Sequence, residues 1–586
     1  MKFRALITGA VALAIVASFA LAPAAPALAL QPGDARVAGT ITDSVSGAGL
    51  PNVCIVNGPV AIRCWTIPNS VGDYEVIIPG IGGVNYSTNI QFFLPGYTSQ
   101  SHNVTVTGGS DIPLNVALVL TTPGSTPPTT TAPAWVGNPP PPDPARPTFT
   151  VYLPNIVRML GGRYGWHTPF IIQNVGAVST NLSVKYYTFS DGSLVATRTA
   201  TVLPGRSFVG SPNDEGDLPA DTQFSVVITS VGSPVVAVVN EHQGGPGITA
   251  EALSYSGLSS GSTKVNLPLV SKLAGGWLTT MIMQNLGAAT ASVNATFNRL
   301  DAVAAPVTLT RVVQPGRSQF IDPRSELTLA DGAEYAVTVT SVEPIGVVAN
   351  AHNDLPGSVA PMGDSYNGIP NVINTTSYSP YVPKNTDGVG RSSRVVIQNA
   401  GTTAVMPSIT LNAYVGGVQT TVTAPSIEPG ASWSFVPAVA DGESSMVVAG
   451  GTFAILTTAI SPATAMFYTG TSTPATKLYL PNVTRTLSGG AGDLGWTTPI
   501  LIQSADATAA TLRWYRFSDG SLVTTQPLTL TSGATTRVDP RLVPGLSDNT
   551  QYSVVLESPG NLVAIVTELN LLAGDNAMIY KAFLQP

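Results

Sequence analysis

Charged residues are scarce in this chain of 586 residues. Asp, Glu, Lys and Arg make up only 10% of it, and 26 basic against 33 acidic residues leave a net charge of −7. Soluble domains usually contain about a quarter of charged residues. A nucleic-acid-binding protein needs a concentrated positive surface, and a coiled coil needs many Glu, Lys and Arg residues. The composition therefore excludes both of these classes.

Histidine and cysteine, which often bind metals or act as nucleophiles, are almost absent. The chain has four His and two Cys. It contains no His-Glu-x-x-His motif, P-loop, dinucleotide fingerprint or EF-hand loop, and no pair of carboxylates can be assigned to glycoside hydrolysis. We therefore expect no catalytic residue, no metal site and no cofactor, and we predict that the protein is not an enzyme.

Helical periodicity is also missing over any stretch longer than about two turns. The chain instead contains 57 Gly and 49 Pro, which interrupt helices, while 44% of its residues are hydrophobic. Its mean hydropathy is +0.25, too apolar for a disordered chain. These properties predict an all-β protein with many turns and a neutral surface.

The first 29 residues have the pattern of a secretory signal peptide. Met1 to Arg4 is a short basic start, Ala5 to Ala22 is apolar, and Ala27-Leu28-Ala29 offers a small-x-small cleavage site. An uncleaved N-terminal membrane anchor is the alternative, because the apolar run reaches 18 residues. No second run of membrane length follows. We expect a secreted or extracellular protein, soluble or held at the cell surface by non-covalent contacts.

The two cysteines agree with export. Cys54 and Cys64 lie ten residues apart on what should be neighbouring strands. In an oxidising compartment the simplest prediction is one disulfide, which would stabilise the fold by about 2–3 kcal/mol in the chain-entropy model.

A Pro- and Thr-rich segment at 121–148 divides the chain. It includes four consecutive prolines, from Pro139 to Pro142, and is expected to be an extended, semi-rigid linker. The segment before it, 36–120, contains several short runs with alternating apolar and polar residues, which predict a small antiparallel β-sandwich.

Five short patterns in this first module occur in a characteristic order. Val37-Ala-Gly-Thr-Ile-Thr-Asp43 comes first, followed by Gly49-Leu-Pro-Asn-Val53, Gly72-Asp-Tyr74, Leu94-Pro-Gly-Tyr97 and Leu114-Asn-Val-Ala-Leu118. In this order the module resembles the carboxypeptidase regulatory-like domain. The resemblance implies a transthyretin-like sandwich, grouped with carbohydrate-binding-like folds, and a non-catalytic accessory role.

The chain after the linker is an internal repeat with a period of about 105–114 residues. One landmark is an apolar-Gln-Asn motif, at Ile172-Gln173-Asn174, Met283-Gln284-Asn285, Ile397-Gln398-Asn399 and Ile502-Gln503-Ser504. A second is a Pro-Gly turn, at Pro204-Gly205, Pro315-Gly316 and Pro429-Gly430, with Ser532-Gly533 in the fourth place. A third is an opening motif, at Tyr152-Leu-Pro-Asn155, Asn266-Leu-Pro268, Tyr381-Val-Pro383 and Tyr479-Leu-Pro-Asn482.

The repeat length is that of one Ig-like sandwich, and the repeats resemble tandem Ig-like modules of bacterial cell-surface proteins. We expect four such modules, at 149–260, 261–375, 376–475 and 476–586. The first and last are most similar, because both contain Phe-Ser-Asp-Gly-Ser-Leu-Val, at 189–195 and 517–523. The fold prediction is thus five tandem antiparallel β-sandwich modules, and modules in series joined by short links should form an elongated object.

A tryptophan lies seven residues before the Gln in three of the four repeats, at Trp166, Trp277 and Trp496, and Arg391 takes this place in the third. An exposed Trp could stack on a sugar ring, whereas a buried one would anchor the opening segment. Glu241 and His242 form a second candidate. They could belong to a metal or acid–base site, or simply to the polar end of a strand.

No residue argues for catalysis, so the primary expectation is a structural or adhesive role at the cell surface or in the extracellular matrix. Possible partners are a polysaccharide, a cell-envelope component or surface proteins. One alternative is a carbohydrate-binding protein that uses Trp166, Trp277 and Trp496 as platforms. Another is an accessory subunit of a separate extracellular hydrolase.

Overall fold

The computed structural model describes most of the chain after the first 34 residues. The described ranges are 35–50, 53–57, 72–78, 85–94, 97–98, 100–120, 146–161, 165–243, 251–354, 361–370, 372, 374–386, 388–488, 495–570 and 575–584. The predicted signal peptide and nearly all of the predicted linker lie outside these residues. So do Cys64 and the side chain of Cys54, and the disulfide stays a prediction.

The chain forms two compact units, one of Met1–Val53 and Pro68–Val119 and the other of Cys54–Ile67 and Leu120–Pro586. In the first unit, β1 pairs antiparallel with β3 and parallel with β7 and β8, and β4 pairs antiparallel with β6. The N-terminal strands are β1 (Ala35–Asp43), β2 (Cys54–Asn57), β3 (Asp73–Ile78), β4 (Tyr86–Phe93), β5 (Tyr97–Thr98), β6 (Gln100–Val106), β7 (Asp111–Pro113) and β8 (Val116–Leu120).

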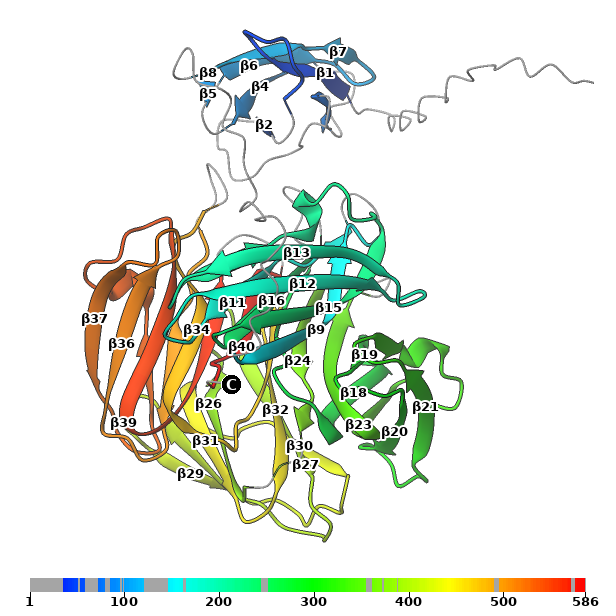
Figure 1. The fold of residues 1–586 in the computed structure, drawn as a ribbon, viewed down its shortest axis with the longest axis vertical. Coiled ribbons are helices and arrows are strands. Elements are labelled where there is room, and N and C mark those ends of the chain that lie inside the picture. The colour runs from blue at the N-terminus through cyan, green and yellow to red at the C-terminus, as the bar shows by residue number, and fades with distance from the viewer. Residues whose placement is uncertain are drawn as a thin grey trace, which may run out of the picture. The chain divides into compact units, whose positions relative to one another are not determined.

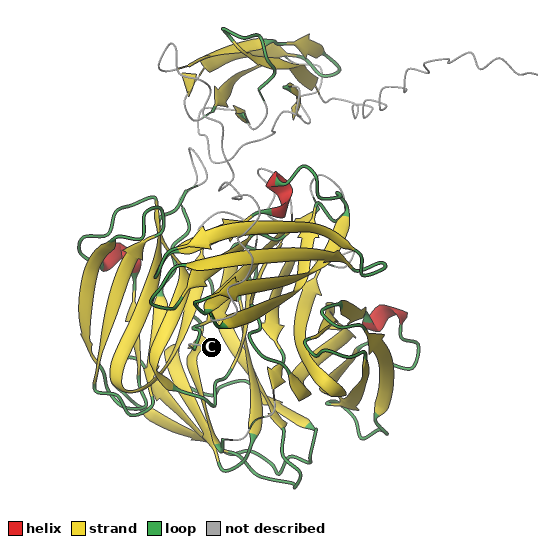
Figure 2. Cartoon of the chain, in the orientation of Figure 1, coloured by secondary structure: helices red, strands yellow, loops and turns green. Residues whose placement is uncertain are grey.

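The second unit contains four antiparallel β-sandwich modules, which we number 1 to 4 along the chain. The all-β prediction is confirmed: Figure 2 shows strands and loops with only short helical turns, and these are 3-10 turns in the part of the chain described. No described helix is long and apolar enough to cross a membrane.

Module 1 shows the plan of the others. Its two sheets have the strand orders β13-β12-β15-β9 and β10-β16-β11-β14, with β17 paired to β16. Alternate residues of a strand point to opposite faces, so Leu182, Val184 and Tyr186 are buried between the sheets. The strands are β9 (Thr148–Arg158), β10 (Trp166–His167), β11 (Phe170–Asn174), β12 (Thr180–Thr188), β13 (Leu194–Val202), β14 (Ser207–Gly210), β15 (Thr222–Val231), β16 (Val235–Gln243) and β17 (Glu251–Ser256), with a 3-10 turn, η1 (Pro212–Asp214).

Modules 2, 3 and 4 repeat this plan. In modules 2 and 4 one long strand, β23 or β39, passes through both sheets. Module 2 contains β18 (Ser262–Ala274), β19 (Trp277–Asn285), β20 (Ala291–Arg299), β21 (Val307–Val313), β22 (Ser318–Ile321), η2 (Pro323–Ser325), β23 (Ala333–Asn353), β24 (Met362–Asn367) and β25 (Ile369–Pro370). Module 3 contains β26 (Thr376–Lys384), β27 (Ser392–Asn399), β28 (Ser408–Ala413), β29 (Gln419–Val422), β30 (Ser432–Phe435), β31 (Gly442–Ala449), β32 (Phe453–Ile460) and β33 (Ala465–Thr469). Module 4 contains β34 (Ala475–Arg485), β35 (Ile500–Ser504), β36 (Ala509–Arg516), β37 (Leu522–Thr529), β38 (Thr535–Val538), η3 (Pro540–Leu542), β39 (Thr550–Leu569) and β40 (Ala577–Lys581).

The four modules close into a ring. One strand near the end of each module lies at its centre, where β17 contacts both β24 and β40, and β33 contacts the same two strands. Figure 1 shows modules 1 to 4, coloured from cyan to red, following one another around this centre. The expectation of an elongated object is therefore wrong for these four modules.

Apolar burial between modules accounts for the closure. Val396, Leu456 and Phe467 of module 3 belong to the core cluster of module 2. Ile171 and Val236 of module 1 belong in the same way to the core cluster of module 4. Each sandwich thus has a second apolar surface, and the ring removes all four of these surfaces from water.

The third opening motif lies three residues earlier than the sequence suggested. The Tyr255 hydroxyl donates to the Asn155 carbonyl in module 1, and Tyr468 donates to Tyr381 in module 3, both at 2.6 Å. Tyr381 is therefore the counterpart of Asn155, and the motif is Tyr378-Ser-Pro-Tyr381 rather than Tyr381-Val-Pro383. Both stretches read Tyr-x-Pro, so spacing alone could not separate them.

Candidate functional site at the module interfaces

The Asn of the apolar-Gln-Asn motif closes a turn within its own module. Asn174 Nδ2 donates to the carbonyls of Val178 and Val202, both at 2.8 Å, and its Oδ1 accepts from Gly176 N at 3.0 Å. Asn285 and Asn399 make the corresponding bonds. This recurring Asn therefore stabilises a turn within its own module.

The Pro-Gly turn is bound to the same Asn. Gly205 N donates to the Asn174 carbonyl at 3.0 Å, and the φ of Gly205 is 71°, a conformation that favours glycine. Gly316, Gly430 and Gly533 have the same role and a similar φ. The two strongest sequence landmarks are thus two halves of one turn.

The Gln of the motif reaches into the preceding module. Gln398 Nε2 donates to the Val337 carbonyl at 3.2 Å and the Thr338 hydroxyl at 3.3 Å in module 2, and to the carbonyl of Gly430 in its own turn at 3.2 Å. Gln284 and Gln503 bind modules 1 and 3 in the same way. In module 1, neither polar atom of the buried Gln173 has a hydrogen-bond partner among the described residues.

The difference between Gln398 and Gln173 provides a matched test of the contacts between modules. We expect Gln398→Leu to lower the free energy of unfolding by about 1–3 kcal/mol, because it leaves buried carbonyls without a donor. Gln173→Leu should be neutral or stabilising, because it removes a buried amide that has no partner. Urea denaturation of both variants would check this, and equal losses would contradict the assigned contacts.

A hydroxyl from each module docks on a proline carbonyl of its neighbour. Ser318 Oγ donates to Pro154 O at 2.9 Å, and Ser207 Oγ of module 1 donates to Pro481 O of module 4 at 3.4 Å. The other two interfaces use Ser432 to Pro268 and Thr535 to Pro380. Module 1 therefore docks on module 4 as each later module docks on its predecessor.

The interfaces from module 1 to 2 and from module 4 to 1 share an arginine contact. Arg206 donates to the Ser518 carbonyl in the Phe-Ser-Asp-Gly loop of module 4. Arg317 lies 3.6 Å from the ring centre of Tyr187, beside the same loop of module 1. Ala431 and Ala534 replace the arginine at the other two interfaces. The Phe-Ser-Asp-Gly loop of module 1 thus lies beside Arg317 of the next module in the chain. The same loop of module 4 meets Arg206 of module 1 because the ring brings these two modules together.

The same two interfaces contain a buried carboxyl between two amides. Glu241 accepts from Asn155 Nδ2 at 2.9 Å and from Asn350 Nδ2 of module 2 at 3.0 Å. Burial raises the pKa of Glu241 to about 7, although both amides act to lower it. Glu568 lies in the same way between Asn482 and Asn240 of module 1, and burial raises its pKa to about 7.

The alternatives for Glu241 and His242 can be compared with this geometry. Burial lowers the pKa of His242 to about 3, and both oxygens of Glu241 are bound by amides. Within the described ranges, no group of three His, Cys, Asp or Glu could hold a metal ion. In the structure, Glu241 and His242 thus contribute to contacts between modules.

Two aspartates join modules at the centre of the ring. Asp364 of module 2 accepts from the backbone of Ser254 at 3.0 Å in module 1, Ser365 at 2.7 Å and Phe467 at 2.6 Å in module 3. Asp575 of module 4 accepts from Gly363 N at 2.6 Å and from Ala465 N at 3.1 Å. Each carboxyl therefore connects three modules.

The three tryptophans are half-buried, each at a different interface. The ring of Trp166 lies 5.1 Å from that of His352 in module 2, and Trp496 lies 6.1 Å from His242 in module 1. Trp277 lies 5.2 Å from Phe467 in module 3. At the remaining interface Arg391 is buried, and burial raises the pKa of Asp575, while the charge of Arg391 acts against this rise.

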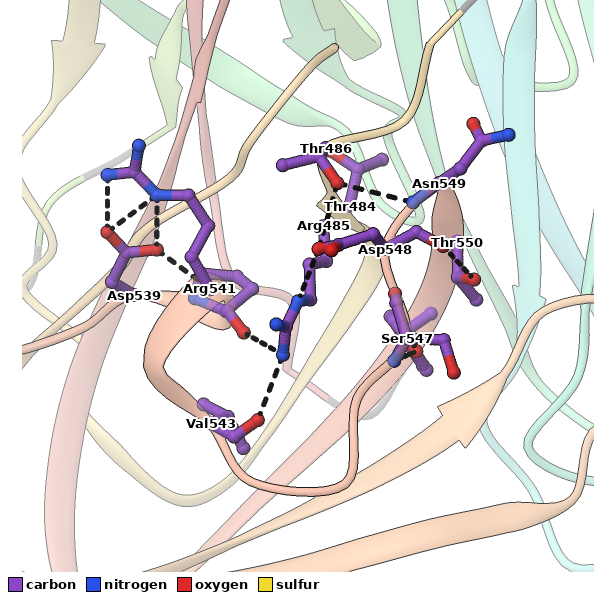
Figure 3. Close-up of polar contacts among 12 residues, drawn as sticks. Thr484, Arg485, Thr486, Asp539, Arg541, Val543, Ser547, Asp548, Asn549 and Thr550 are labelled. Atoms are coloured by element: carbon purple, nitrogen blue, oxygen red, sulfur yellow. Dashed lines mark hydrogen bonds and ion pairs between the residues drawn. The ribbon is translucent and has the colours of Figure 1, made fainter. Parts of the chain in front are cut away.

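A basic residue recurs at or near the end of the first strand of each module, and the sequence analysis did not identify it. Figure 3 shows it in module 4, where Arg485 donates to Asp548 at 2.8 Å and to the Val543 carbonyl at 3.2 Å. Thr486, which follows, has a φ of 47° and donates to the same aspartate. The counterparts are Arg158, Lys272 and Lys384, which donate to carbonyls of the equivalent loops.

A sequence signal for this cation exists. Each of the four lies four residues after the proline of the opening motif, once that motif is placed at Pro380 in module 3. With the third opening motif placed at Pro383, Lys384 does not fit this spacing. These cations hold the loop between the two sheets.

Comparison with known proteins gives no family. No family model matches the chain, and no curated protein matches it. Among solved structures it is similar to the full-length RrgB pilus protein from Streptococcus pneumoniae, with 9% identity, a TM-score of 0.13, and coverage of 75% of this chain and 93% of that one. It is also similar to a tetra-tandem repeat in the extending region of a large adhesion protein, with 13% identity, a TM-score of 0.09, and coverage of 71% and 94%. At these TM-scores the likeness carries no argument about module arrangement.

Proposed function

We propose that this is a non-catalytic exported protein with a structural or adhesive role at the cell surface or in the extracellular matrix. The observation that supports this role is the use of the recurring residues. Recurring Gln, Ser or Thr, and at two interfaces Arg, bind one module to the next, while the Asn and Pro-Gly positions close a turn within each module. The repeat pattern therefore maintains a closed body rather than four separate catalytic or binding centres.

Closure supports such a role on physical grounds. In an open series, the first and last modules would each leave one docking surface exposed to water. In the ring, both surfaces are covered by the contacts of Arg206, Ser207 and Asn240 with module 4. A body without free docking surfaces resists local opening, which suits a protein that must persist outside the cell.

The test is retention by cell-surface material. The mature chain, residues 30–586, would be incubated with isolated cell envelopes and with insoluble polysaccharides, and the pelleted fraction measured. Retention on either material is expected, and a chain that stays in the supernatant with both would contradict the adhesive role. Bovine serum albumin at equal concentration controls for trapping in the pellet.

Carbohydrate binding is the second candidate, and one observation favours it. Trp277 borders a cleft of about 320 Å³ between modules 2 and 3, whereas Trp166 borders a space of only about 120 Å³. Trp166 and Trp277 are therefore not equivalent as platforms, and Trp277 is the stronger candidate of the two.

A further inference from the structure

The cleft between modules 2 and 3 lies where the interface between modules 1 and 2 has a bonded polar cluster. In that cluster Glu241 accepts from Asn155 and Asn350. The counterparts between modules 2 and 3 are Leu269, Ala351 and Thr458, and all three line the open cleft. No carboxyl extends from Ala351, and the space beside the same tryptophan position is about 320 Å³ rather than about 120 Å³.

The wall of this cleft combines an aromatic ring with a paired charge. Trp277 is half-buried, and Phe467 lies beside it. Arg394 of module 3 donates to both carboxylate oxygens of Glu334 of module 2, each at 2.6 Å, so the cleft has no net charge from this pair. A planar ion pair offers several donors and acceptors at fixed positions.

We propose that this cleft binds one sugar ring of a neutral polysaccharide. The indole of Trp277 would lie against the apolar C–H face of the ring, while Arg394 and Glu334 would bind its hydroxyls. The volume is near the lower end of the usual range for ligand pockets, about 300–1,000 Å³, which suits a single ring. The balanced charge of the ion pair favours a neutral sugar over a uronic acid. The inference deepens the proposed adhesive function and rests on it for its biological use.

The experiment titrates the mature chain with cellohexaose, laminarihexaose, chitohexaose, mannohexaose and xylohexaose, and with an oligogalacturonate as the charged comparison. Calorimetry and tryptophan fluorescence report binding. We expect at least one neutral oligosaccharide to bind. Trp277→Ala should weaken that binding by at least about tenfold, as for a central aromatic anchor. Trp166→Ala, at the equivalent position of module 1, should change it less than about twofold.

Trp277→Phe keeps the proposal testable if Trp277→Ala fails to fold. This variant keeps an aromatic ring beside Phe467 and should fold normally, as circular dichroism and urea denaturation would show. Its smaller ring, which lacks the indole N–H, should weaken saccharide binding severalfold. The proposal is overturned if no neutral oligosaccharide binds the parent, if oligogalacturonate binds more tightly, or if folded cleft variants bind like the parent. The envelope assay is independent, so retention on envelopes by a saccharide-negative parent would preserve the adhesive role and reject only this cleft.

Discussion

Replacing Asp364 by alanine is expected to lower the free energy of unfolding of the four-module unit by about 3 kcal/mol or more. The carboxyl is fully buried and accepts three backbone N–H groups, from Ser254, Ser365 and Phe467. The substitution leaves all three donors without an acceptor, and each buried unpaired donor costs about 1–3 kcal/mol. Since the donors belong to three modules, the loss should destabilise the centre of the ring rather than one sandwich.

Urea denaturation followed by tryptophan fluorescence would measure this loss. Glu428→Ala is the matched control, because Glu428 is an exposed acid whose removal should change the stability by less than about 0.5 kcal/mol. Hydrogen exchange at Ser254 and Phe467 should also speed up in the Asp364 variant. Unchanged exchange at these two amides would show that the carboxyl does not join the modules.

The second large effect concerns pH. The carboxyls of Glu241 and Glu568 have pKa values raised by burial from 4.5 to about 7 in the folded protein. A raised pKa means that the folded state binds the proton more tightly than the unfolded chain. The resulting stabilisation is complete below pH 4.5 and is lost as the pH rises through about 7. The loss amounts to about 3 kcal/mol for each carboxyl.

The double variant Glu241→Gln, Glu568→Gln removes both titrations. The unfolding free energy of the natural protein should therefore fall more steeply between pH 5 and pH 8 than that of the variant. His242 acts in the opposite direction, because burial lowers its pKa to about 3, but it is present in both proteins. Urea denaturation at several pH values gives the two slopes. Parallel slopes would mean that the carboxyls do not titrate at the interfaces.

The sequence predicted the turns of the modules because its landmarks are local. The Asn174 side chain, the Gly205 turn and the strand that follows the Gln all lie within about 35 residues of one another. Turn chemistry and a period of two determine such a structure directly. The error of register at Pro383 arose because two consecutive Tyr-x-Pro stretches fit the same pattern.

The elongated shape was a wrong prediction because it treated each module separately. The sequence did contain a signal for closure. The Phe-Ser-Asp-Gly loops occur in modules 1 and 4, and the arginines that face them, Arg206 and Arg317, occur in modules 1 and 2. In an open series the loop of module 4 and Arg206 would have no partners. Comparing the repeats position by position with their neighbours would have revealed this arrangement.

The candidate sugar site shows what the sequence alone could not decide. Trp166, Trp277 and Trp496 share a repeat position, and their residue type gives each the same capacity to stack on a sugar. Whether a cleft is present depends on Leu269, Ala351 and Thr458, which come from two modules and are far apart in the chain. Local sequence patterns do not encode which of these side chains meet.

The sequence by itself determined that this protein is all-β, that its long C-terminal part repeats, and where the tight turns of each repeat lie. These properties follow from strand alternation and from residues such as Gly205, whose conformation depends on immediate neighbours. The tertiary structure decided the closure of the ring, the pairing of Glu241 and Glu568 with amides of the next module, and the open cleft at Trp277. Each of these depends on how whole sandwiches are oriented when their outer apolar surfaces are buried together.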